Sequence, residues 1–463
     1  MFLSGFTTRL LFFVCLVMVG ISQISKANSQ TLEEALTSAY MNNPSLLGQR
    51  ANVRAADEKV PQALSNWRPS IKFTGSAGGS AVMTSTIDGV NRRQHREPKS
   101  IGVTLTQQIF SGGKTIAETN SAENTVLAER ARLIKKEQDI LLLAAKAYLN
   151  VYKDEAVLNL NTSNEEVLKR QMQATRDRFQ VGEITRTDVF QASARMAGAT
   201  ADLTASKGAL ESSRATYKNV IGTSTPTNLV LPKIVGDLPR DLKTVIQMAL
   251  KNNPSVIAAE FDRKALDDNV DKVRGDLLPS LSLTSGLSKK FQSGSETGRI
   301  DTADVTLNLT IPFYQQGAVY SKMREAKQKV AKGIYTVDQA RRDAIESATK
   351  AWESLLSARA RVKSFKAQND ANKIALEGVQ REAQVGSRTV LDVLDAEQEL
   401  LDSRVSYVTS ERDKILAVFE LRVAIGQLTA KDLQLKVDTY SPVKNYHQVE
   451  SKWFGIGIID GAK

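Results

Sequence analysis

The chain of 463 residues contains one cysteine and two histidines, and its 62 Lys and Arg residues against 51 Asp and Glu residues give a formal net charge of +11. So few cysteines and histidines argue against a zinc site, a disulfide framework and a histidine-based catalytic triad. We therefore predict a protein that is not an enzyme and that needs neither a cofactor nor a metal ion.

Residues 1–27 have the features of a secretory signal peptide. Arg9 precedes the apolar run LLFFVCLVMVGI, and Ser25-Lys26-Ala27 places small residues at the two positions that a signal peptidase reads. Cys15 lies inside this segment, so the exported chain is expected to have neither a disulfide nor a lipid anchor. Export argues against nucleic acid as the partner of this basic chain and favours anionic lipid headgroups or lipopolysaccharide, with an ordinary solvated surface as the alternative.

The sequence contains the same plan twice. NNPS occurs at 42–45 and again at 252–255, which is 210 residues later, and QVG at 180–182 recurs at 384–386, which is 204 residues later. Each half is predicted to run as a short helix, two strands and a long helical block that is broken once. We expect two structural repeats at 28–221 and 241–433, a connector at 222–240 rich in Pro, Gly and Thr, and a C-terminal tail at 434–463.

Four segments have the alternation of apolar with polar or small residues over roughly 10 positions that is typical of membrane β-strands. A half-buried sheet in a soluble protein is the alternative. Aromatic residues stand at the segment ends, where an interfacial girdle would place them: Trp67, Phe110, Phe291, Phe313 and Tyr314. The segments are IKFTGSAGG after Ser70, SIGVTLTQQIF at 100–110, SLSLTSGLSKKF at 280–291 and ADVTLNLTIPF at 303–313.

The segment NRRQHREPK at 91–99 is strongly basic. We predict a loop here, which between two outer-membrane strands would face anionic lipopolysaccharide. A soluble loop is the alternative.

Long helices are predicted in both halves. Proline is absent between Pro98 and Pro226 and between Pro312 and Pro442, and these intervals are rich in helix-forming residues. In each interval two glycines stand 69 positions apart, Gly113 and Gly182 in the first and Gly317 and Gly386 in the second. A helix of that length would be on the order of 100 Å long. Helices of that length must lie against one another as coiled coils or as a helical barrel.

The fold class that follows is mainly α with a membrane β-barrel portion. Beyond the signal peptide, no apolar run approaches the roughly 18 to 20 residues of a membrane helix. Four strands cannot close a barrel, and an open sheet edge is not tolerated in lipid, so the strands must be pooled between subunits. A homotrimer with a twelve-strand barrel is the smallest solution, and it would place twelve long helical arms around one axis.

Gly182 and Gly386, the glycines of the two QVG motifs, fall where each long helix should reverse direction. We predict that they form the tip turns of two helical hairpins. After the second turn, four acidic residues recur at helical spacing on one stripe, and threefold symmetry would turn the first two into carboxylate rings that attract cations. A solvent-exposed acidic face is the alternative. The acidic stripe is Asp392, Asp395, Glu399 and Asp402, and the apolar residues expected to pack on a different face are Leu394, Leu401, Val405 and Val408.

VGSRTVLDVLDAEQELLDSRVSYV at 385–408, AIGQLTAKDL at 424–433 and PFYQQG at 312–317 resemble the TolC family of outer-membrane export channels. The likeness covers nearly all of the chain after the signal peptide. It implies a trimer in the outer membrane of a Gram-negative bacterium, in which the twelve-strand barrel is continued into the periplasm by a long α-helical barrel of coiled coils. It also implies an exit duct for inner-membrane pumps of the RND or ABC type, joined through a periplasmic adaptor (membrane fusion) protein.

By this resemblance, Arg388 matches the arginine that latches the closed tip to the neighbouring hairpin, and Thr187 and Asp188 match its partners. Asp392 and Asp395 match the aspartates of the constriction. Gln384 stands where the family has a tyrosine that assists the latch, and this departure puts the second link in doubt.

We therefore predict a passive exit duct for tripartite efflux or type I protein secretion, gated at its periplasmic tip. A periplasmic coiled-coil scaffold or adhesin without a pore is the alternative from another class. Small toxic compounds and secreted proteins would need the same wide, wet tunnel, so the sequence leaves the cargo open.

Overall fold

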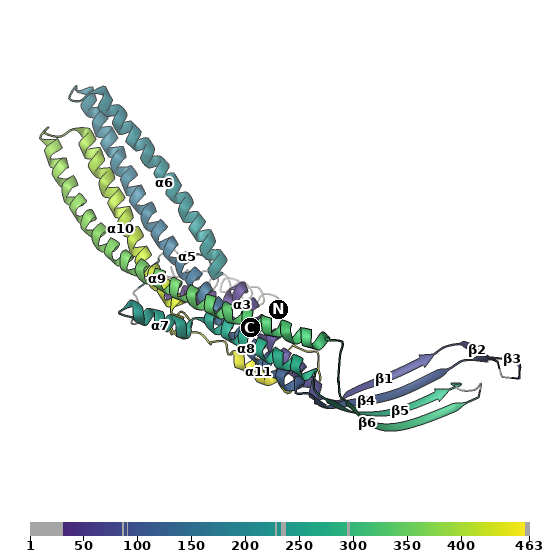
Figure 1. The fold of residues 1–463 in the computed structure, drawn as a ribbon. Helices are drawn as coiled ribbons and strands as arrows, with labels where there is room; N and C mark the ends of the chain where they lie inside the picture. Colours follow the sequence, from purple (N-terminus) through teal and green to yellow (C-terminus); the bar gives the residue numbers. More distant parts are fainter. Residues whose placement is uncertain are drawn as a thin grey trace, which may run out of the picture. The chain divides into compact units, whose positions relative to one another are not determined.

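The computed structural model of the protein describes residues 31–85, 88–89, 91–226, 229–232, 238–293 and 297–458 (Figure 1). The predicted signal peptide at 1–27 lies outside these residues. The chain divides into two compact units, and each takes segments from both predicted repeats. Unit 1 comprises Met1–Pro44, Glu137–Leu242 and Thr349–Asp438, and unit 2 comprises Ser45–Lys136, Lys243–Ala348 and Thr439–Lys463.

Unit 2 contains a four-stranded antiparallel sheet in the order β1-β4-β5-β6, which confirms the four predicted strand segments. At one end of the sheet Ser111 pairs with Ser280, and Ser280 pairs with Thr310. We call this end the foot of the sheet, because the chain continues from it into helices. The strands are β1 (Ser70–Ala77), β4 (Lys99–Ser111), β5 (Ser280–Phe291) and β6 (Arg299–Thr310).

The register gives this sheet one apolar face and one polar face. Phe73 lies opposite Val103 and Val103 lies opposite Leu287, while nearer the foot Leu283 lies opposite Leu307. Successive side chains of a strand point to opposite faces. One apolar face and one polar face is the pattern of strands with lipid on one side and water on the other. The polar face carries Lys72, Thr74, Thr104, Thr106, Ser282, Thr284, Thr306 and Asn308.

Two strand boundaries differ from the predictions. The basic segment at 91–99, predicted as a loop, is largely strand β3 (Asn91–Arg96), which pairs antiparallel with β2 (Ser80–Ser85). The strand was not predicted because its residues are polar and show no apolar alternation. Backbone pairing with β2 forms the hairpin without an apolar face. The predicted strand at 303–313 starts earlier, as β6, and ends before Pro312, which has no backbone N–H to donate.

Aromatic side chains gather near the foot of the sheet. Trp67 lies just before β1, Phe110 lies at the end of β4, and Phe313 and Tyr314 follow β6 with 90% and 75% of their surface exposed. Phe291 ends β5 at the opposite end. These are the positions expected of an interfacial girdle.

The rest of unit 2 is helical. The first part of α5 packs with α3, α4 and α11 around an apolar core of Ala56, Val60, Ala63, Ala122 and Val126. The helices are α3 (Pro44–Asp57), α4 (Lys59–Leu64), η1 (Ser65–Trp67), α7 (Leu242–Asn252), α8 (Pro254–Gly275), α11 (Pro442–Val449) and the first parts of α5 and α9.

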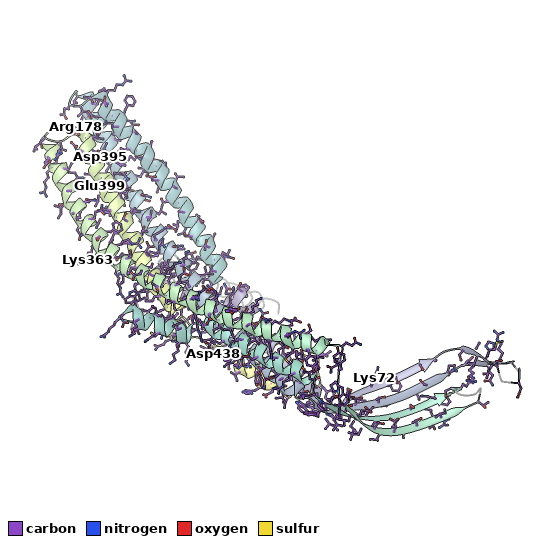
Figure 2. All side chains as sticks on the ribbon, viewed as in Figure 1. Lys72, Arg178, Lys363, Asp395, Glu399 and Asp438 are labelled. Carbon is purple, nitrogen blue, oxygen red and sulfur yellow. The ribbon has the colours of Figure 1, made fainter. Side chains whose placement is uncertain are left out.

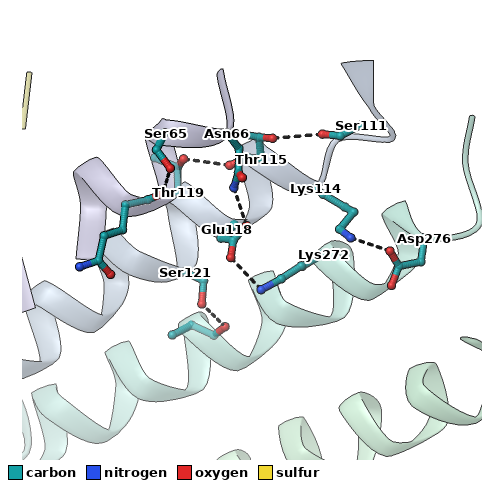
Figure 3. Close-up of polar contacts among 12 residues, drawn as sticks. Ser65, Asn66, Ser111, Lys114, Thr115, Glu118, Thr119, Ser121, Lys272 and Asp276 are labelled. Carbon is teal, nitrogen blue, oxygen red and sulfur yellow. Dashed lines mark hydrogen bonds and ion pairs between the residues drawn. The ribbon is translucent and has the colours of Figure 1, made fainter. Parts of the chain in front are cut away.

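Ion pairs join the start of α5 to the end of α8 at the foot of the sheet (Figure 3). Lys114 Nζ lies 2.6 Å from Asp276 Oδ1, and Lys272 Nζ lies 2.8 Å from Glu118 Oε1. The approach requires a glycine, because a Cβ added to Gly112, whose φ is +66°, would lie 2.4 Å from the carbonyl oxygen of the last α8 residue. These contacts fix how the strands of the sheet enter their helices.

Unit 1 is helical. It contains the second parts of α5 (Lys114–Gln180) and α9 (Ala318–Gln384). These two whole helices have 67 residues each and confirm the predicted long helices. Helices α6 and α10 return from them. Within the described part of the chain, no helix is long and apolar enough to cross a bilayer. The remaining helices of the unit are α2 (Leu32–Asn42), α6 (Arg186–Ile221) and α10 (Val390–Ala424).

Side chains of α2 and of its C-cap residue donate to carbonyl groups that the end of α6 leaves without helical partners. Ser38 Oγ donates to the carbonyl oxygen of Ile221 at 3.1 Å, and Asn43 Nδ2 donates to that of Val220 at 2.9 Å. The fully buried Tyr148 of α5 donates its hydroxyl to the Val230 carbonyl oxygen at 2.8 Å, which ties the connector to the same unit.

Candidate functional site at the helical hairpin tips

The two glycines predicted as tip turns lie in the connections α5–α6 and α9–α10. Gly182 and Gly386 have φ of +81° and +80°, the left-handed region that glycine adopts without steric cost. In the first turn the Gly182 N–H donates to Phe179 O and the Glu183 N–H donates to Arg178 O, each at 3.0 Å. This pair of hydrogen bonds is a Schellman motif, which ends the incoming helix.

The second turn repeats this geometry. The Gly386 N–H donates to Ala383 O at 3.2 Å, and the Ser387 N–H donates to Glu382 O at 3.0 Å. Ser387 Oγ donates to the same Glu382 oxygen at 2.9 Å. Both tips therefore have one local architecture, which is set by a glycine at the same place in each repeat.

Each returning helix begins with a capping box. Thr185 accepts a hydrogen bond from the Asp188 N–H, and the Thr185 N–H donates to Asp188 Oδ2 at 2.9 Å. In the second hairpin the Thr389 N–H donates to Asp392 Oδ2 at 2.9 Å, and Thr389 Oγ1 donates to it at 2.8 Å. Both aspartates therefore have a structural role at the helix start, which the duplicated Thr-x-x-Asp spacing could have revealed.

The ion pairs of the two tips have opposite polarity. In the first tip, Arg178 at the end of α5 donates from Nε to Glu183 of the turn at 2.9 Å. In the second tip the acid is on the helix and the base is on the turn, and Arg388 Nε donates to Glu382 Oε2 at 2.8 Å. Glu382 was not among the predicted residues, although its position six residues before Arg388 offered the signal.

The structure does not bring the predicted latch residues together within one chain. Arg388 is about half exposed and bonds Glu382, while Asp188 is occupied by its own capping box. Thr187 is exposed on the first turn of α6, and Gln384 is exposed at the end of α9.

The acidic stripe lies along one side of α10. Asp395 and Glu399 are labelled on this helix near the tips in Figure 2. These two residues and Asp402 are exposed and Asp392 is half-buried, while Leu394 and Leu401 on the other side are buried. The core beneath the tips is formed by Leu168, Ala192, Ala199 and Leu394.

Asp395 has a partner that the sequence analysis missed. Arg195 of α6 donates through Nη2 to Asp395 Oδ1, and this ion pair links the returning helices of the two hairpins. Arg195 lies seven residues after Asp188 and hence on the same side of α6, which was the available signal. The pair partly neutralises one of the two aspartates predicted to form the constriction.

The capping box also affects the charge of Asp392. Hydrogen bonds from the backbone and hydroxyl of Thr389, with Arg388 nearby, hold the pKa of the Asp392 carboxyl below its ordinary value. Glu382 raises the pKa of the Arg388 guanidinium. Both side chains therefore stay ionised at neutral pH. The described residues contain no group of three or more His, Cys, Asp or Glu that could hold a metal ion.

Replacing Gly386 by alanine should loosen the second tip. An added Cβ would meet nothing within 4 Å, so the effect is the left-handed backbone cost of about 1 to 2 kcal/mol. We expect amide hydrogen exchange around this turn to accelerate about 5- to 30-fold.

The matched control is Gly198→Ala on the exposed surface of α6, where an added Cβ also meets nothing. There alanine should slow exchange or leave it unchanged, because glycine in a helix interior costs roughly 0.5 to 1 kcal/mol relative to alanine. Equal behaviour of the two variants would contradict the assigned turn geometry.

Comparisons with known proteins identify the family. A family model described as outer membrane efflux protein matches residues 35–223 and 245–427, and this double match confirms the duplication. The chain is similar to the outer membrane efflux protein BepC of Brucella suis biovar 1, with 35% identity over 436 residues that cover 94% of each chain. It is also similar to the outer membrane protein TolC of Escherichia coli K12, with 25% identity over 438 residues that cover 89% of this chain and 85% of the relative.

A solved structure with the same fold is the Campylobacter jejuni CmeC outer membrane channel. Its TM-score is 0.76 at 18% identity, with 91% of this chain and 89% of that chain covered. The chain belongs to the outer membrane efflux protein family, the TolC family of non-enzymatic outer-membrane channels for efflux or secretion in Gram-negative bacteria.

Proposed function

We propose that this outer-membrane channel is a passive homotrimeric duct whose periplasmic end is gated at the hairpin tips. The family to which the chain belongs implies a trimeric channel that works with efflux systems. In our proposal the tips lie at the periplasmic end and the sheet crosses the outer membrane.

The sheet supports a trimeric membrane portion. Its apolar face is largely exposed in the single chain, with Phe73 71% and Val305 73% exposed. β1 and β6 form the two edges of the four-stranded sheet. An edge with unpaired backbone groups is not tolerated in lipid, so β1 of one subunit would pair with β6 of the next and close the sheet around the trimer.

The tips support the gate. The observation that carries this part of the proposal is Arg388, which is exposed on a turn and held by a single ion pair with Glu382. A cation in that place can exchange its local partner for Thr187 or Asp188 of the neighbouring hairpin in another subunit. Because exposed ion pairs are weak, contact with another protein could break such a latch, and Gln384 would contribute less to it than the tyrosine of related channels.

The acidic stripe supports a cation-attracting entrance. Around a threefold axis, Asp392 and Asp395 would each form a ring of carboxylates, with Asp395 partly neutralised by Arg195. Rings of this kind select and hold cations. The constriction would then begin just after the turn that carries Arg388.

The partners we propose follow from this arrangement. A periplasmic adaptor would contact the tips and connect the duct to an inner-membrane pump of the RND or ABC type. At the other end the sheet would contact outer-membrane lipid, and the β2–β3 hairpin with the exposed Arg93 and His95 would face lipopolysaccharide. Nucleic acid is not a proposed partner.

Single-channel recording in a planar bilayer tests this proposal. We expect the purified protein to insert and give a small, cation-selective conductance, and to fractionate with the outer membrane as an oligomer whose mobility changes on heating. A soluble periplasmic monomer, or a folded and inserted preparation without conductance, would instead support a coiled-coil scaffold without a pore.

A further inference from the structure

The end of the described chain exposes an unusual concentration of apolar surface. Phe454, Ile456 and Ile458 are each at least 87% exposed, and Trp453 is 58% exposed. Residues 453–458 form no helix or strand, and these side chains are not buried within the described chain. Contiguous exposed apolar side chains of this size mark a surface that contacts something other than water.

The segment is held in a fixed place by α11. Asn445 Nδ2 donates to Oδ2 of the buried Asp57 at 2.8 Å, and the Arg130 guanidinium lies 5.1 Å from the centroid of the Tyr446 ring. Val449 at the end of the helix is buried. These contacts dock α11 on α3 and α5, so the apolar segment that follows starts from a defined position in unit 2.

That position is the foot of the sheet. Arg68 Nη1 donates to the Lys452 carbonyl oxygen at 2.7 Å, and its guanidinium lies 4.9 Å from the centroid of the Trp453 ring. Arg68 stands two residues before Ser70, where β1 begins. The apolar segment therefore leaves the protein where the sheet enters its helices, beside the exposed aromatic residues of the predicted girdle.

Two cations lie directly beside the segment. Arg68 stacks on Trp453, and Lys452 donates from Nζ to the carbonyl oxygen of Gly457 at 3.2 Å. Aromatic rings at the level of lipid headgroups, flanked by Lys and Arg, are the composition of an interfacial membrane segment. The cations could reach lipid phosphate groups while the apolar side chains contact acyl chains.

We propose that residues 453–458 are an interfacial anchor that lies in the periplasmic leaflet of the outer membrane at the foot of the sheet. The occupant of this apolar surface is phospholipid, with Arg68 and Lys452 toward the phosphate groups. The inference rests on the proposed function, because it needs the sheet to cross the membrane. It assigns to the C-terminal tail a role in fixing the depth of the channel in the bilayer.

Tryptophan fluorescence of the full-length channel in liposomes tests the anchor. The sequence has three tryptophans, so Trp67→Phe with Trp352→Phe leaves Trp453 as the single emitter. We expect strong quenching by phosphatidylcholine brominated near the headgroup end of its acyl chains, weaker quenching by lipid brominated near the chain ends, and protection from aqueous iodide. Quenching by iodide alone would overturn the proposal, because Trp453 would then lie in water.

Quenching by neither agent would also overturn it, because a protein surface such as a second copy of the chain would then cover Trp453. Two further variants are made in a chain that lacks all three natural tryptophans. They distinguish a failure of the anchor from a failure of the proposed function. Phe73→Trp reports on the apolar face of the sheet, and Phe190→Trp on α6 is the matched control, since Phe190 is 60% exposed near the tips.

If brominated lipid quenches Phe73→Trp but not Trp453, the anchor is wrong and the membrane portion stands. If it quenches neither, the proposed function itself fails. Phe190→Trp should respond to iodide only. Equal quenching of Phe190→Trp and of Trp453 by brominated lipid would overturn the anchor, because Trp453 would then contact lipid no more specifically than the hairpin tips do.

Discussion

Replacing Arg388 by alanine should raise the single-channel conductance and increase leakage through the outer membrane. The variant removes the cation of the second turn that, in our proposal, bridges to a neighbouring hairpin. A single exposed ion pair is weak, but three equivalent contacts around a trimer are lost together, and we expect the open-to-closed ratio to rise about threefold to a hundredfold. Conductance in planar bilayers and uptake of a large antibiotic by intact cells measure this change.

The structure supplies a variant with the opposite sign. Glu382 holds Arg388 within its own chain, so Glu382→Gln should free the guanidinium for the latch and lower the open probability. Arg178→Ala is the matched control, because it breaks the corresponding ion pair of the first tip without touching Arg388. If all three variants conduct like the natural channel, the latch is not at these residues and the gate must be sought elsewhere.

The parts of the fold that the sequence predicted are those with a local physical cause. Absence of proline over more than a hundred residues indicates long helices, and the glycine of each QVG motif ends one helix at a turn. Alternation in the strands predicts one apolar and one polar face, and the strand register agrees. Because the plan is duplicated, each such prediction is made twice. The observed ends of α5 and α9 lie within a few residues of the glycines that predict them.

What the sequence did not reveal depends on contacts between distant residues. Arg195 and Asp395 are separated by 200 positions, and neither residue is unusual for a helix surface. The β2–β3 hairpin has no apolar pattern, since pairing alone forms it. The place of the C-terminal tail also depends on a distant contact, because Asn445 donates to the buried Asp57, which is 388 positions away. Only the folded unit 2 shows where the segment after α11 lies.

The capping boxes change how the constriction should be understood. The same Asp392 carboxylate that was predicted to line a ring also accepts two hydrogen bonds from Thr389. A side chain held in this way has a fixed orientation and a stable negative charge. The cap therefore makes Asp392 better suited to an electrostatic role at the entrance, because the ring would not need to be ordered by a bound cation.

Asp392→Asn combined with Asp395→Asn should lower the cation selectivity of the channel and its block by multivalent cations. Asparagine keeps the size of aspartate and can still accept the Thr389 N–H bond of the cap, so the change is mainly one of charge. Around a trimer it removes two rings of carboxylates. Reversal potentials in a salt gradient measure the selectivity, which we expect to fall by more than half on the scale of the cation-to-anion permeability ratio.

Three comparisons make this prediction specific to the tip. Glu399→Gln with Asp402→Asn removes the same charge from the same stripe farther from the tip and should have a smaller effect. Arg195→Ala removes the partner of Asp395 and should raise selectivity and multivalent block, provided that the helices stay paired.

The pKa of Asp392 is lowered, so Asp392 stays charged as the pH falls through the ordinary carboxylate range. The share of the selectivity that Asp392 contributes should therefore be lost only at more acidic pH. If the double variant at the tip and the pair farther along the stripe reduce selectivity equally, the carboxylates act as a diffuse acidic lining and no constriction lies at Asp392 and Asp395.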